Sequence, residues 1–214
     1  QQLWIINAYA LVLSGLLLGA GTLGDRTGHR RMFLIGLAVF GGASLLAAYS
    51  PSAWTLVLGR AFLGCGAAIM MPSSLALLRL TFPDEVERNT AIGIWGSVAV
   101  IGAAAGPTVG GFFLEHFWWG SVFLLNVPVV VVTIVLTLFL APPNTPNPLK
   151  HWDFPSCLYS LITLVSLVLA IKSLAHNWPV SAAAGIVFIC GALAFGRRQA
   201  RLSDPLLTFD IFGS

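Results

Sequence analysis

The chain has 214 residues, of which 57% are hydrophobic and only 9% are charged. Soluble domains carry about 25% charged residues, so this composition excludes an ordinary water-soluble fold. The formal net charge of +3 is small, and the basic residues fall in short loops between apolar runs, as in membrane proteins. We therefore expect a lipid bilayer as the main surroundings and no nucleic-acid partner.

Seven apolar runs follow one another, each close to the length of about 20 residues that a helix needs to cross a bilayer. Lipid offers no hydrogen-bond partner to the backbone, and the runs lack the alternation of barrel strands, so each is expected to be a helix. The predicted fold class is an all-α polytopic membrane protein. Its spans are residues 3–23, 31–49, 53–78, 88–112, 118–141, 154–175 and 178–196.

The basic residues also predict how these spans are oriented. Positive residues collect in short cytoplasmic loops, and most of the eleven Lys and Arg residues lie in loops or in the tail on one side. The beginning of the chain is therefore expected outside and its end in the cytoplasm. The basic residues on this side are Arg26, Arg30, Arg31, Arg79, Arg88, Lys150, Arg197, Arg198 and Arg201.

The loop after the first span, which we name the gating loop, covers residues 25–31. Its glycine at 28 can adopt the positive φ of a tight turn, Asp25 can face a positive helix N-terminus, and its arginines can pair across neighbouring helices. We expect it to hold two helical bundles together. An ordinary basic loop is the alternative. The residues concerned are Asp25, Arg26, Gly28, Arg30 and Arg31.

Arg60 is conspicuous because it lies inside the third span. An arginine at membrane depth costs several kcal/mol unless it faces protein or water. No carboxylate lies deep in any of these spans, so we expect its partner on a helix that this chain lacks. The alternative is a side chain that extends to the outer interface.

Glycines repeat every four residues in the fourth span, at Gly102, Gly106 and Gly110. Such a small-residue face favours the close approach of another helix. Pro107 removes a backbone hydrogen bond and favours a kink. Plain packing, without a role in transport, is the alternative.

Residues 142–153 carry four prolines, which cannot continue a helix. We predict that five spans occupy residues 1–141, that 142–153 form a cytoplasmic linker, and that two further spans occupy 154–196. Residues 197–214 are expected to be a cytoplasmic tail. Because the chain opens at Gln1, directly on an apolar run, we expect a fragment.

Three of these patterns, in this order, resemble signatures of the major facilitator superfamily. Residues 21–31, which include the gating loop, resemble its loop between helices two and three, residues 56–68 its fourth-helix motif, and residues 102–111 the fifth-helix motif of its drug antiporters. Further segments are similar to the fourteen-helix drug/proton antiporters, namely residues 2–9, 71–79, 115–128 and 152–156. On this resemblance the chain covers helices two to eight and lacks helix one and the C-terminal bundle of the same protein, and the last two spans are extra central helices.

The resemblance implies proton-coupled efflux of amphipathic, cationic small molecules by alternating access, across the inner or plasma membrane. The proton gradient would supply the energy, with no cofactor. Arg60 would serve proton coupling, and Asn7 would lie on the substrate pathway, where related exporters often carry an acid. Because an amide cannot neutralise a cation, Asn7 is expected to disfavour divalent substrates. The antiport helix would be formed around Gly102, Gly106, Pro107, Gly110 and Gly111.

Other classes of function fit less well. No span combines a nucleophile with a base, and the cysteines and histidines lack the spacing of metal ligands, so we expect neither an enzyme nor a metal site. A seven-span receptor fits the span count, although Lys172 lies near the edge of the sixth span, whereas a retinal-binding lysine would lie mid-membrane on the last. An inert truncated fragment is the remaining alternative.

Overall fold

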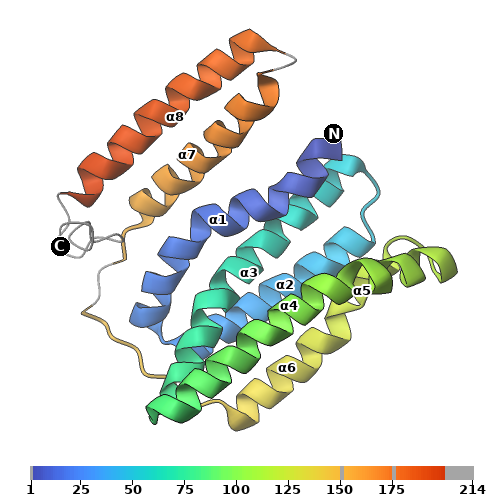
Figure 1. The fold of residues 1–214 in the computed structure, drawn as a ribbon, viewed down its shortest axis with the longest axis vertical. Helices are drawn as coiled ribbons and strands as arrows, with labels where there is room; N and C mark the ends of the chain where they lie inside the picture. Colours follow the sequence, from blue (N-terminus) through green and yellow to red (C-terminus); the bar gives the residue numbers. More distant parts are fainter. Residues whose placement is uncertain (1, 150–151, 175–176, 201–214) are drawn as a thin grey trace.

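The computed structural model describes residues 2–149, 152–174 and 177–200, and all regular structure in these ranges is α-helical. The predicted all-α class is thereby confirmed. The helices are α1 (Gln2–Thr27), α2 (His29–Ala48), α3 (Ala53–Thr81), α4 (Glu85–His116), α5 (Ser121–Leu124), α6 (Asn126–Leu140), α7 (Phe154–Ser173) and α8 (Trp178–Gln199) (Figure 1).

Six spans in the described ranges are long and apolar enough to cross a membrane, and α1 supplies a seventh if its two halves are taken together. Those halves, Asn7–Leu17 and Gly19–Thr27, meet at 54°. Helices α5 and α6 share one span, Ser121–Leu140, with a break at Leu125. Pro128 contributes to that break, since it has no N–H to donate to the carbonyl of Leu124.

Side-chain caps explain where several helices begin. The Asp84 carboxylate accepts from the backbone N–H groups of Val86, at 2.9 Å, and Glu87, at 3.0 Å. It thereby satisfies two of the donors that a helix start leaves without partners. Ser52 caps α3 in the same way through the N–H of Thr55, at 3.2 Å.

The centre of the fold lies where α3 crosses α1 and α2, and α5 and α6 pack on α2 (Figure 1). Glycines allow the close approach of α2 and α3. A Cβ added at Gly66 would lie 2.8 Å from the backbone nitrogen of Phe40 and 3.0 Å from the carbonyl oxygen of Gly36. The buried cluster of Ala43, Ala47 and Leu63 fills this crossing.

The last two helices form a separate antiparallel pair. They pack on one another, and α7 also packs along α1, so the pair lies beside α1 (Figure 1). The linker that leads from α6 to α7 is irregular over residues 141–149 and 152–153. Most of the predicted tail, from residue 201 onward, lies outside the described residues.

Candidate functional site

Residues 25–27 of the gating loop end α1 and residues 29–31 begin α2, so the tight turn between the two helices lies at Gly28. Gly28 has a φ of 93°, which is the only positive φ in the part of the chain that the structure describes. This conformation suits glycine because it has no Cβ. The Gly28 N–H donates to the carbonyl of Gly24 at 2.8 Å, and the Gly28 carbonyl accepts from the N–H of Met32 at 3.1 Å. The turn expected at Gly28 is therefore found.

The charged groups of this loop contact both α2 and α6. The Asp25 carboxylate lies 3.1 Å from Nε2 of His29, the first residue of α2. Arg30 donates from Nη2 to the carbonyl of Leu138 at 2.7 Å. This carbonyl is among the last of α6, where helix geometry leaves acceptors without partners and the dipole favours a cation. The side chains of Arg26 and Arg31 are exposed.

The linker contacts the gating loop, which the sequence did not suggest. The Asn144 amide oxygen accepts from the backbone N–H of Arg31 at 3.1 Å, and its Nδ2 donates to the carbonyl of Thr27 at 2.9 Å. The backbone N–H of Asn147 donates to the carbonyl of Asp25 at 3.1 Å. The only signal in the sequence is an asparagine among prolines, where its side chain readily bonds to backbone groups.

Arg60 is held by α1. Its Nε donates to the carbonyl of Ile5 at 3.0 Å, and its guanidinium carbon lies 5.8 Å from the centre of the Tyr9 ring, within cation–π range. We expected the partner on a helix that this chain lacks, but α1 supplies a carbonyl and an aromatic ring. A carboxylate partner stays a prediction. Asn7 lies between Ile5 and Tyr9 on α1 and is half-buried.

The glycine face of α4 meets no neighbour in the part of the protein described. A Cβ added at any of its motif glycines would have nothing within 4 Å, and no residue of α4 is buried. The helix runs without interruption through Pro107. The close helix contact predicted from this pattern is therefore absent from the described residues, and a partner beyond them stays a prediction. The glycines are Gly102, Gly106, Gly110 and Gly111.

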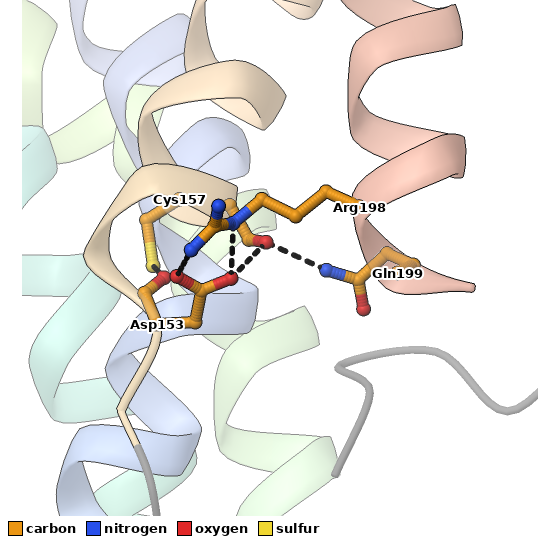
Figure 2. Close-up of polar contacts among 5 residues, drawn as sticks. Asp153, Cys157, Arg198 and Gln199 are labelled. Carbon is orange, nitrogen blue, oxygen red and sulfur yellow. Dashed lines mark hydrogen bonds and ion pairs between the residues drawn. The ribbon is translucent and has the colours of Figure 1, made fainter. Parts of the chain in front are cut away.

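A second polar group, which we name the polar clasp, joins the start of α7 to the end of α8 (Figure 2). Arg198 donates to both oxygens of Asp153, from Nε at 2.8 Å and from Nη2 at 2.7 Å. Ser156 donates to the same carboxylate and accepts from Nε2 of Gln199 at 2.7 Å. The bond from Arg198 holds the pKa of Asp153 below its usual value.

The residue before the clasp attaches the linker to α1. Trp152 donates from Nε1 to the carbonyl of Gly19 at 3.1 Å. Gly19 has to be small here, because an added Cβ would overlap Sγ of Cys157 on α7. The clasp and this contact were not predicted. Within the described ranges, no group of three or more His, Cys, Asp or Glu side chains could hold a metal ion.

Comparison with known proteins identifies the family. A family model described as Major Facilitator Superfamily matches residues 1–207. The chain belongs to this superfamily. A seven-span receptor is accordingly not favoured, and the similar proteins are named as an efflux pump, a resistance protein and a transporter rather than as enzymes.

Individual relatives span the whole chain. It is 46% identical to the multidrug efflux pump LfrA of Mycolicibacterium smegmatis, over 99% of the chain and 42% of that protein. It is 41% identical to the methyl viologen resistance protein SmvA of Salmonella typhimurium, over 99% of the chain and 43% of that protein. It is 33% identical to the riboflavin transporter RibZ of Clostridioides difficile, over 99% of the chain and 46% of that protein. The chain thus spans less than half the length of these relatives.

Proposed function

We propose that this chain is part of a secondary transporter that exports drugs or other amphipathic, cationic small molecules across a cell membrane in exchange for protons. The family and the names of the relatives support export of small molecules. Alternating access would be produced by rocking of helical bundles about a site near the membrane midplane. On the predicted orientation, the gating loop lies on the cytoplasmic side.

Arg60 is the observation that carries the proton-coupling part of this proposal. A guanidinium inside a membrane helix costs several kcal/mol unless protein or water compensates it. One carbonyl and one ring hold it here, and no carboxylate of the described residues forms an ion pair with it. If a carboxylate pairs with Arg60 in only one state of the transport cycle, the proton affinity of that carboxylate differs between the states. That change is what exchange of protons for substrate requires.

The test is dissipation of a pH gradient by drug in everted vesicles that contain the full-length protein, followed with a pH-sensitive dye. We expect a monovalent organic cation to collapse the gradient with the wild type and not with Arg60→Ala. Arg79→Ala is the matched control, because Arg79 is exposed near the end of the same helix. It should respond as the wild type does. Equal responses from wild type and Arg60→Ala would contradict the coupling role.

The charge class of the substrate is tested at Asn7. Because an uncharged amide cannot neutralise a second positive charge, we expect the wild type to respond to monovalent cations and poorly to divalent ones. Asn7→Asp should extend the response to divalent cations. A strong wild-type response to a divalent cation would contradict this part of the proposal.

A further inference from the structure

Asn144 lies where two helices meet and supplies what both of them lack. Helix α2 begins after Gly28, which has no side chain to cap it. The donors of a first helical turn and the acceptors of a last turn have no partners within the helix. The Asn144 oxygen accepts from Arg31 in the first turn of α2, and its nitrogen donates to Thr27, the last residue of α1. One amide thus caps both helices.

The shape of the turn fits this amide. A Cβ added at Gly28 would overlap Oδ1, Nδ2 and Cγ of Asn144. Glycine is therefore favoured at position 28 for two separate reasons, which are the positive φ and the space for Asn144. The two hydrogen bonds have opposite polarity, so they also fix which end of the amide faces each helix.

The linker is attached at further points. The N–H of Asn147 donates to the carbonyl of Asp25, and Trp152 and Asp153 bond to α1 and α8. Linker residues on both sides of positions 150–151 are therefore bonded, 144 and 147 to the gating loop and 152 and 153 to α1 and α8. A change in the turn at Gly28 has to break or move the bonds of Asn144.

We propose that Asn144 is a positioning residue of the transport cycle, which holds the gating loop in the conformation seen here by capping α1 and α2 together. This inference rests on the proposed transport function. Asn144 lies on the linker and acts through the loop, so its loss should change how fast the loop rearranges and leave substrate binding as it is. In kinetic terms, turnover changes while KM does not.

Two measurements on the full-length protein test this inference. The first is hydrogen exchange of the Arg31 amide, and the second is drug turnover and KM in vesicles. We expect Asn144→Ala to speed exchange at Arg31 about tenfold, since a protecting hydrogen bond is lost. We expect turnover to change at least about threefold with an unchanged KM. Asn144→Asp keeps the acceptor for Arg31 and loses the donor to Thr27, so turnover should change while exchange at Arg31 stays slow.

Asn147→Ala is the matched control. Its contact with the loop is made by the backbone N–H, which alanine retains, and its side-chain oxygen accepts from the N–H of Leu149 in the linker rather than from the loop. Unchanged exchange at Arg31 in Asn144→Ala would overturn the inference, as would equal effects of Asn147→Ala and Asn144→Ala. A wild type that moves no drug would refute the proposed function, while the exchange measurement would still decide whether Asn144 positions the loop.

Discussion

Two helices of this protein carry closely spaced glycines, but only one of the two sets packs against neighbouring helices in the part of the chain that the structure describes. In α3, Gly59, Gly64 and Gly66 are buried against neighbouring helices. A Cβ at Gly64, for example, would lie 2.6 Å from the carbonyl oxygen of Tyr9 on α1. In α4, the glycine face at Gly102 and Gly106 is exposed and meets nothing.

The contrast shows what a small-residue pattern predicts. It indicates a surface suited to close helix packing, but it carries no information about which segment packs there. The glycines of α3 meet α1 and α2 within this chain. For α4, we predict a partner from the part of a full-length transporter that lies beyond this chain.

The largest expected effect is a loss of stability in Gly66→Ala. Its new Cβ would lie 2.8 Å from the backbone nitrogen of Phe40, so α2 and α3 would have to separate. Overpacking of this kind costs about 1–3 kcal/mol, and we expect about 2 kcal/mol here. Thermal unfolding in detergent measures it. Gly42→Ala on α2 is the control, because a Cβ there meets nothing; equal midpoints for the two variants would contradict the packing account.

A smaller loss is expected in Asp153→Asn, because α7 and α8 are joined partly by the polar clasp. Hydrogen bonds to charged groups contribute about 1.5–3 kcal/mol, but the Arg198 side chain is 40% exposed, so we expect about 1 kcal/mol. Thermal unfolding of the wild type and the variant in detergent measures this difference. The clasp would be irrelevant to stability if Asp153→Asn unfolded at the wild-type temperature.

The pH dependence of the clasp is smaller still and has a defined sign. The pKa of Asp153 is lowered in the folded protein, so the unfolded state binds more protons at acidic pH and stability falls with decreasing pH. The contribution is complete above the unfolded value of about 3.9 and is lost as the pH falls through the folded value. The stability difference between wild type and Asp153→Asn should be constant from pH 7 to 5 and shrink below about pH 4. A difference that vanished between pH 7 and 5 would rule out this ion pair as its source.

The smallest expected effect on folding is that of Gly106→Ala. A Cβ there meets nothing within the described residues, and alanine favours a helix more than glycine does. We expect the isolated chain to unfold within about 0.5 kcal/mol of the wild type, as for other surface substitutions. Drug turnover of the full-length protein, in contrast, should fall, because a partner helix would be displaced. Destabilisation of the isolated chain would show that α4 packs within it.

The features that were predictable from the sequence are local. Apolar runs predicted the helices because the bilayer fixes their length and lipid forbids other backbone structure. The turn at Gly28 followed from one residue and its charged neighbours. The contacts of Asn144 with the gating loop join residues 113 and 117 positions apart, and Arg198 lies 45 positions from Asp153. Such pairings depend on how the helices pack, and no short pattern encodes them.

The Arg60 prediction was limited in a different way. Its position inside a span showed that it needs a partner, but any polar group can meet that need. Backbone carbonyls occur at every residue, so no feature of the sequence singles out the carbonyl of Ile5. The carbonyl of Ile5 and the ring of Tyr9 were not predicted as partners, because neither is a carboxylate.

The most direct test of the contrast between α3 and α4 is the mobility of a spin label on α4 in the full-length transporter, after replacement of the native cysteines. Gly106→Cys carries the label on the glycine face. Ile101→Cys carries it about 140° around the helix, on a residue that is 65% exposed. We predict an immobilised, oxygen-inaccessible label at 106 and a mobile, oxygen-accessible label at 101. Equal mobility and oxygen access at both positions would contradict a partner for the glycine face.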